Sequence, residues 1–281
     1  MSDAAFSTLT RGHGRRAPES TFTEVTDRIS RWLLAVEAAG LADAFDEAVH
    51  DAGVTLPFHE LRSLTEPARA ACRAAAAPSA AFGELLARLE TRLGAALPPS
   101  LVGFWELRER SPEWRSLVGA LVRPRIFEPS CYLDHDLGAA YRLSIAVTRN
   151  SMSPVHETLE DEYVEWFAET DEAKRATAAT WRDFAVGDSV MLDPEIRYSL
   201  IEIGSDHGEW VEVVSDWRDG SGESPIFRAG DDYEGDADLL ATTVPEWLGL
   251  EIDVTLARLT RYDDFRMVAS GAAALAGQNW K

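Results

Sequence analysis

The chain has 281 residues, 46% of them hydrophobic, so it is long enough to bury a core in one large domain or a small domain with additions. Its 48 acidic residues outnumber 27 Lys and Arg, which gives a formal net charge of -21. This balance argues against binding to duplex nucleic acid or an anionic membrane, because both need clustered basic side chains. It favours attraction toward basic partners, although the acidic surface of an ordinary cytoplasmic protein explains it equally well.

The cysteines and the N-terminus indicate a reducing compartment. Cys72 and Cys131 lie far apart and match neither a zinc-ligand spacing nor a disulfide framework, so we interpret them as free or buried thiols. Residues 1–20 contain arginines but no apolar run of the secretory type, and no stretch approaches the roughly 20 apolar residues that cross a bilayer. We therefore predict a cytoplasmic protein in which residues 1–20 form a flexible arm.

Apolar residues recur at helical spacing in the first part of the chain. Residues 22–49 predict one or two helices broken near Gly40, and the alanine-rich stretch 61–77 predicts another. An apolar stripe over 82–93 predicts a third helical segment. The proline pair at 98–99 then begins a further helix, because proline suits the first turn, where N–H groups lack intrahelical partners.

After residue 120 the pattern changes. Alternation of apolar and polar residues over 141–148 predicts a half-buried strand, and residues 157–181 predict a helix. Turns rich in glycine and aspartate then separate short apolar segments. These segments predict three strands, at residues 189–192, 198–203 and 210–214.

The last elements complete an α+β fold. Residues 225–228 predict a short edge strand, and residues 239–248 predict a closing helix, with Thr243 a possible cap and Pro245 in its first turn. From Val254 the chain alternates briefly and then becomes rich in Ala and Gly. The fold class predicted is a helical N-terminal region followed by a small antiparallel sheet packed with helices.

Two stretches of the sequence carry a family resemblance. The first, Phe82–Trp105, contains a helix, the Leu97-Pro98-Pro99-Ser100 corner and an aromatic-bearing second helix. The second, Leu200–Leu248, contains the central strands, a polar turn, an acidic loop and the closing helix. In this order they resemble the SUKH superfamily, which contains bacterial toxin-immunity proteins and a fungal regulator of cell-wall synthesis.

The resemblance covers about half of the chain and implies a division into domains. Arg108–Pro112 stands where the family usually has an Asn-Gly turn, and a long insertion, about residues 110–185, separates the two matching stretches. The predicted parts are a flexible arm (1–20), a helical N-terminal region (21–80), a SUKH-like domain (81–253) and a C-terminal extension (254–281).

The segment between residues 201 and 240 concentrates negative charge, with twelve acidic residues and two arginines. Trp210 and Trp217 lie among these acids. Such an arrangement suits a protein-binding surface, where aromatic rings supply buried area and acids steer the partner, although indoles in the core of a strand are the alternative. We predict that the partner-binding surface comprises Asp206, Glu209, Trp210, Asp216, Trp217, Asp231, Asp232, Tyr233, Glu234 and Asp236. Three other tryptophans fit core stripes: Trp32, Trp105 and Trp247.

The sequence holds no complete catalytic or metal-binding motif. His156–Glu160 lacks the second histidine of a zinc peptidase, and residues 231–238 lack the ligand order of an EF-hand. His135 and His207 lie beside carboxylates without a nucleophile elbow, phosphate loop or dinucleotide fingerprint. We therefore predict no metal, no cofactor and no enzymatic reaction.

The resemblance implies an intracellular immunity protein that binds and neutralises a basic toxin domain, with no nucleic-acid or membrane partner. Two alternatives stay open. One is a hydrolase or transferase that uses Mg²⁺ or Mn²⁺ held by carboxylates. The other is a regulatory scaffold of the same fold that has no toxin as its partner.

Overall fold

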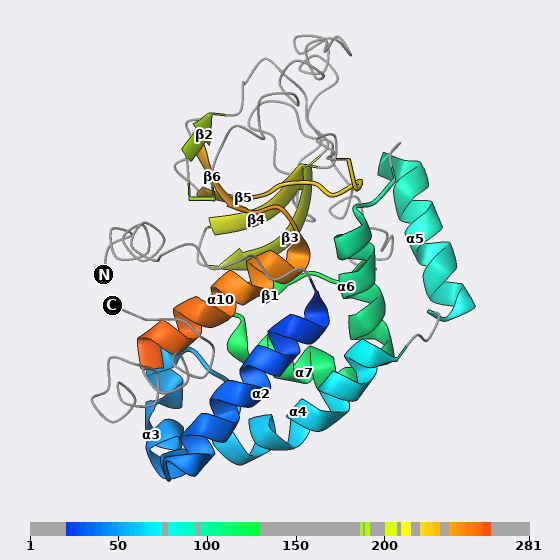
Figure 1. The fold of residues 1–281 in the computed structure, drawn as a ribbon. Helices are drawn as coiled ribbons and strands as arrows, with labels where there is room; N and C mark the ends of the chain where they lie inside the picture. The colour runs from blue at the N-terminus through cyan, green and yellow to red at the C-terminus, as the bar shows by residue number, and fades with distance from the viewer. Residues whose placement is uncertain are drawn as a thin grey trace, which may run out of the picture. The chain divides into compact units, whose positions relative to one another are not determined.

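The computed structural model describes residues 21–74, 78–93, 96–129, 186–187, 189–191, 200–206, 209–214, 220–230 and 236–259. Within these residues the chain has an α+β fold, with helices and one antiparallel sheet (Figure 1), which confirms the predicted fold class. The chain forms two compact units. We call them the helical unit (Met1–Ala77, Glu106–Arg123 and Pro245–Lys281) and the sheet unit (Pro78–Trp105 and Pro124–Val244).

The helical unit joins segments from both ends of the chain. Its helices are α2 (Phe22–Ala38), α3 (Ala42–Ala52), α4 (Phe58–Arg73), α7 (Pro112–Leu121) and nearly all of α10 (Val244–Leu259), with the end of α6 (Pro99–Arg110). In Figure 1, α2 runs between α10 and α4 and crosses over α7. No helix in the described parts of the chain has both the length and the apolar character needed to cross a membrane.

Local sequence signals explain where these helices begin and end. Thr21 and Glu24 form a capping box, in which each side chain accepts a hydrogen bond from the other residue's backbone N–H. Ser111 caps α7 by accepting a hydrogen bond from the Trp114 backbone N–H. Gly40 lies between α2 and α3 with a φ of 70°, a left-handed conformation that glycine adopts without strain. The predicted break near Gly40 is therefore confirmed.

The core of the helical unit is aromatic and aliphatic. The Trp32 and Phe45 rings lie edge to face with centroids 5.7 Å apart, and Phe45 meets Phe58 at the same centroid distance. The side of α2 that faces this core carries four almost completely buried residues: Val25, Ile29, Leu33 and Val36. Trp32, Trp105 and Trp247 are all buried, which confirms their prediction as core residues.

The sheet unit contains α5 (Ala80–Leu93), the start of α6 and a six-stranded antiparallel sheet in the order β1-β3-β4-β5-β6-β2. The strands are β1 (Arg125–Ile126), β2 (Ser189–Met191), β3 (Leu200–Asp206), β4 (Glu209–Val214), β5 (Ile226–Gly230) and β6 (Asp236–Ala241). The predicted strands near 189, 200 and 210 are thus present. The two edge strands are the shortest, which limits the unpaired edge that the sheet presents.

Both faces of the sheet are covered at β5. Ile226 and Phe227 are consecutive residues of this strand, so their side chains point to opposite faces. Each is at most 1% exposed. The register places Ile226 opposite buried Val213 and Phe227 opposite buried Leu239. At this point of the sheet, any external partner is therefore separated from the strands by other parts of the protein.

The structure corrects two predictions at the end of the sheet. The predicted edge strand at 225–228 is β5, which lies between β4 and β6 and is an inner strand. The predicted closing helix is present as α10, which starts at Val244, directly after the predicted cap position Thr243, and has Pro245 in its first turn; Leu239 and Leu240, which the prediction included in this helix, belong to β6. A short apolar pair such as Leu239-Leu240 fits a buried strand as well as a helix, so periodicity alone misassigned it.

Two further differences concern helices. α7 was not predicted, although Ser111 and Pro112 form a cap and first turn within the stretch assigned to the insertion. α10 continues to Leu259, so the brief alternation predicted from Val254 is part of a helix. The strand predicted at 141–148, the helix predicted at 157–181 and the arm at 1–20 lie outside the described residues.

Candidate functional site

The topology brings several acidic strand ends together. Asp206 ends β3 and lies opposite Glu209, which begins β4. Glu209 in turn lies opposite Gly230, the last residue of β5. Asp236 begins β6, the next strand, and lies opposite Met191 of β2. Because neighbouring strands are about 4.8 Å apart, Asp206, Glu209 and Asp236 lie at the same end of the sheet, which we call the acidic end.

Five further predicted residues belong to β4 or to the connection between β5 and β6. Trp210 lies one residue inward from it, opposite Ser205 and Ala229. The connection from Gly230 to Asp236 leaves and re-enters the sheet at the acidic end, and its residues Asp231, Asp232, Tyr233 and Glu234 lie outside the described residues.

Asp216 and Trp217 belong to a connection that starts at the opposite end of the sheet. They follow Val214, the last residue of β4, whereas Glu209, the first residue of β4, lies at the acidic end. Both residues lie outside the described part of the chain. The topology therefore brings four of the ten predicted positions, Asp206, Glu209, Trp210 and Asp236, to one end of the sheet, and the other six lie outside the described residues.

Charge on the inner strands is strongly unbalanced. The described residues of β3 to β6 include six acidic residues and one basic residue, Arg228. Arg228 lies opposite Asp238, which is exposed. Glu202 and Glu212 lie directly opposite each other, and like charges in opposed positions destabilise a sheet.

One acidic residue of the same region is already engaged within the protein. The two carboxylate oxygens of Glu223 accept hydrogen bonds from the Ser100 backbone N–H at 2.9 Å and from the Ser100 hydroxyl at 2.6 Å. The Ser100 hydroxyl oxygen also accepts a hydrogen bond from the Val244 backbone N–H at 3.1 Å. A carboxylate in this place satisfies the Ser100 backbone N–H in the first turn of α6 and complements the dipole of this helix. Glu223 therefore has a structural role.

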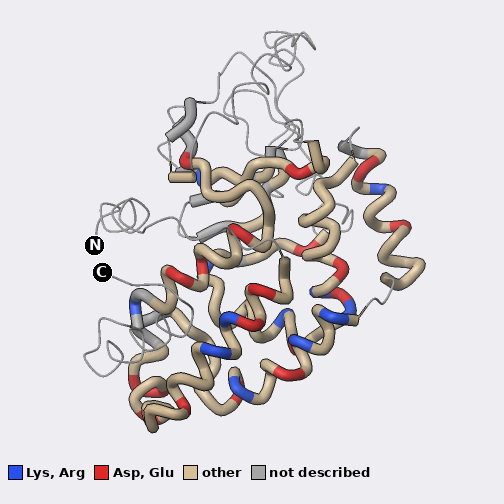
Figure 2. Tube along the Cα trace, viewed as in Figure 1, with Lys and Arg blue, Asp and Glu red and all other residues tan. Residues whose placement is uncertain are grey.

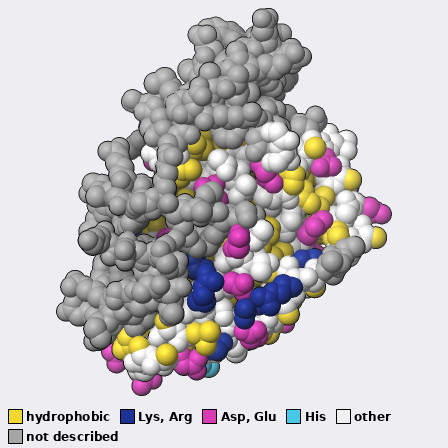
Figure 3. Space-filling model, in the orientation of Figure 1, with side chains coloured by type: hydrophobic (Ala, Val, Ile, Leu, Met, Phe, Trp, Pro, Cys, Tyr) yellow, Lys and Arg dark blue, Asp and Glu magenta, His cyan; other side chains and the backbone are white. Residues whose placement is uncertain are grey.

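Several charged side chains of the helical unit form ion pairs with one another. Arg positions and Asp or Glu positions lie together along α2 and α4 (Figure 2), and arginine side chains gather over these helices on the face shown in Figure 3. Arg69 contacts Asp27 at 2.6 Å and Glu66 at 2.8 Å, and the hydrogen bond to Asp27, followed by that to Glu66, raises the pKa of Arg69. Arg73 also approaches Asp27, at 3.4 Å. The contacts of Arg69 and Arg73 with Asp27 link α4 to α2, whereas Glu66 lies on α4 itself.

A buried arginine ties α2 to α10 within the helical unit. The Arg28 guanidinium donates a hydrogen bond to the Gly249 carbonyl oxygen at 2.6 Å and forms an ion pair with Asp253. The Arg28 side chain is only 9% exposed. A charge removed from water to this extent is stable only when it is paired. The contact with Gly249 and Asp253 provides this pairing and joins two segments that lie more than 220 residues apart in the sequence.

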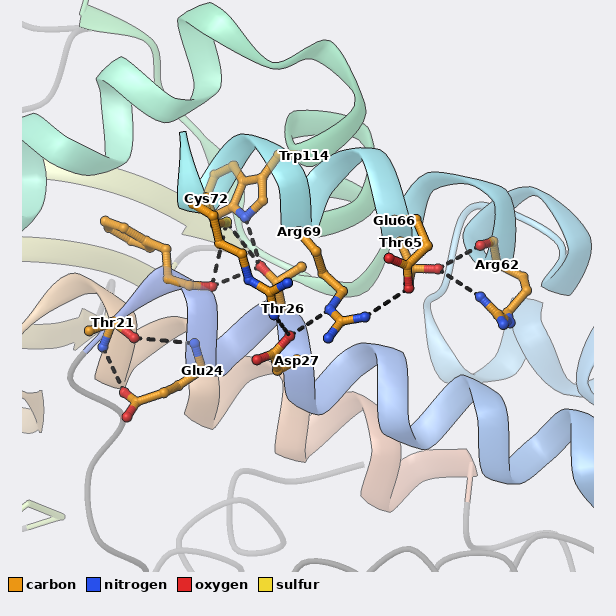
Figure 4. Close-up of polar contacts among 12 residues, drawn as sticks. Thr21, Glu24, Thr26, Asp27, Arg62, Thr65, Glu66, Arg69, Cys72 and Trp114 are labelled. Carbon is orange, nitrogen blue, oxygen red and sulfur yellow. Dashed lines mark hydrogen bonds and ion pairs between the residues drawn. The ribbon is translucent and has the colours of Figure 1, made fainter. Parts of the chain in front are cut away.

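Cys72 belongs to a polar network between α2, α4 and α7 (Figure 4). The Trp114 indole N–H donates a hydrogen bond to the Thr26 hydroxyl oxygen at 3.1 Å, and the Thr26 oxygen lies 3.4 Å from the Cys72 sulfur. Burial raises the pKa of the Cys72 thiol above its usual value, so the thiol stays protonated at neutral pH and is a poor nucleophile. Cys72 is a free cysteine, as predicted. Cys131 lies outside the described residues.

The described part of the chain contains no group of side chains suited to hold a metal ion. Among these residues, no three His, Cys, Asp or Glu side chains are grouped so that they could hold a metal ion. The histidines of the motifs considered above, at positions 135, 156 and 207, lie outside it.

Comparison with known proteins adds no relative. No protein-family model, curated protein or solved structure matches the chain. The SUKH resemblance is therefore carried by the sequence pattern alone, and membership of that family is an interpretation of Phe82–Trp105 and Leu200–Leu248.

Sequence reasoning missed the residues that hold the elements in place. Pro98, Pro99 and Ser100 signal the start of a helix, but the carboxylate that satisfies it lies 123 residues away, on Glu223. No spacing rule predicts such a partner, because the contact depends on the fold of the intervening chain. The partners of Arg28 could not be predicted for the same reason, because Gly249 and Asp253 lie far away in the sequence. The one available signal was an arginine on the apolar face of α2, flanked by Val25, Ile29 and Trp32.

Proposed function

We propose that this chain is a cytoplasmic protein-binding module, and specifically an immunity protein that neutralises a basic toxin domain by stoichiometric binding. The observation that supports the proposal is the acidic end of the sheet. Asp206, Glu209 and Asp236 occupy neighbouring strand ends, and the inner strands carry six acidic residues against a single arginine. The proposed activity is binding, with no reaction catalysed.

The end of the sheet suits this role better than either face of the sheet. Ile226 and Phe227 point to opposite faces and both are buried, so other parts of the protein cover both faces at β5. Strand ends and their connections stay accessible in such an architecture, and binding residues concentrate on segments of this kind that a rigid scaffold holds.

In the proposed association, electrostatic attraction between the acidic end and the basic toxin domain would act before the two surfaces make contact. A cluster of one sign raises the association rate of an oppositely charged partner by roughly 10- to 1000-fold at low ionic strength. The charges then fix the register of the complex, while an aromatic residue such as Trp210 supplies apolar contact area. An interface of about 1,600 Å² in total would cover a basic substrate-binding site on the toxin.

The proposal is tested by reversing charges at the acidic end. The variant carries Asp231→Lys, Asp232→Lys and Asp236→Lys, and the candidate partner is the product of the gene immediately upstream. We expect inhibition of that toxin to weaken by at least roughly 100-fold, because removing one partner of an interfacial charge pair costs about 2–5 kcal/mol.

A second triple variant controls for total charge. Asp43, Glu47 and Glu84 are exposed on α3 and α5, and changing all three to Lys alters the net charge of the chain by the same amount. Inhibition should be retained in this control. Full inhibition by the acidic-end variant, or an equal loss in both variants, would exclude the acidic end as the docking surface.

A further inference from the structure

We draw no further inference here: the strongest candidate, the arginine cluster that Arg62, Arg69 and Arg73 form on α4 beside α2, carries nothing because Asp27, Glu37 and Glu66 already hold its guanidinium groups in ion pairs and nothing in the structure shows what else would bind there.

Discussion

All three arginines of α4 form ion pairs with acidic residues of α2 or α4, whereas strands β3 to β6 carry six acidic residues and one arginine. In the helical unit, charges stabilise the packing of the protein's own helices. In the described strands β3 to β6, Arg228 is the single base beside six acids. Net charge alone does not reveal this difference, because it counts every charge equally wherever its neighbours lie.

The largest effect is expected from replacing Arg28, whose ion pair joins two helices of the helical unit. We expect Arg28→Met to lower the free energy of unfolding by about 3 kcal/mol, because Asp253 and the Gly249 carbonyl oxygen lose their buried partner. Urea denaturation of the full chain measures the change.

Arg31→Met is the matched control, since Arg31 is exposed on the same helix. Its effect should stay within about 0.5 kcal/mol. Equal effects of the two substitutions would show that the Arg28 contact contributes no more than a surface charge.

Within the sheet unit, we expect a smaller loss of stability when Glu223, which is hydrogen-bonded to Ser100, is replaced than in the helical unit, and a still smaller loss when the exposed Asp238 is replaced. Glu223→Gln replaces one carboxylate oxygen with an amide nitrogen that cannot accept from Ser100, so we expect a loss of about 1 kcal/mol. Asp238→Asn, on an exposed position of β6, should change stability by less than about 0.5 kcal/mol. Thermal unfolding of both variants at neutral pH makes the comparison, and a larger loss for Asp238→Asn would contradict it.

The smallest expected effect is the pH dependence contributed by Cys72. Because burial raises the thiol's pKa in the folded state, the unfolded chain loses this proton at a lower pH than the folded chain. The stability contributed by the protonated thiol is therefore complete below the unfolded pKa and declines as the pH rises through the folded pKa.

Comparison with Cys72→Ala in a Cys131→Ser background isolates this contribution. The stability advantage of Cys72 over alanine should shrink as the pH is raised from neutral to strongly alkaline, because burial raises the pKa of the thiol in the folded state. An advantage that grows with pH would show that the thiol is not held in its neutral form.

The sequence predicted those features that depend on local pattern. The helix that begins at Phe22, the break at Gly40, the buried Trp32 and Trp105, and three of the strands follow from periodicity and turn chemistry. The position of β5 inside the sheet did not follow, because strand order is set by long-range pairing that a single short apolar segment does not encode.

The same limit applies to the candidate site. Composition identified the acidic segment, but only the register shows that the Asp206–Glu209 turn adjoins Gly230, and that the connection after Val214 begins at the other end of the sheet. Glu223 looked equivalent to the other eleven acids of this segment until its hydrogen bonds to Ser100 gave it a structural role.

The central claim is that the acidic end attracts a basic protein partner, and the salt dependence of the association rate tests it most directly. For the unmodified chain and the upstream toxin domain, we expect the rate constant to fall at least about tenfold as salt is raised from about 0.05 M to 0.5 M. The Asp231→Lys, Asp232→Lys, Asp236→Lys variant should associate slowly and with little salt dependence. Rates for the unmodified chain that do not change with salt, or a variant that associates as fast as the unmodified chain at low salt, would contradict the claim.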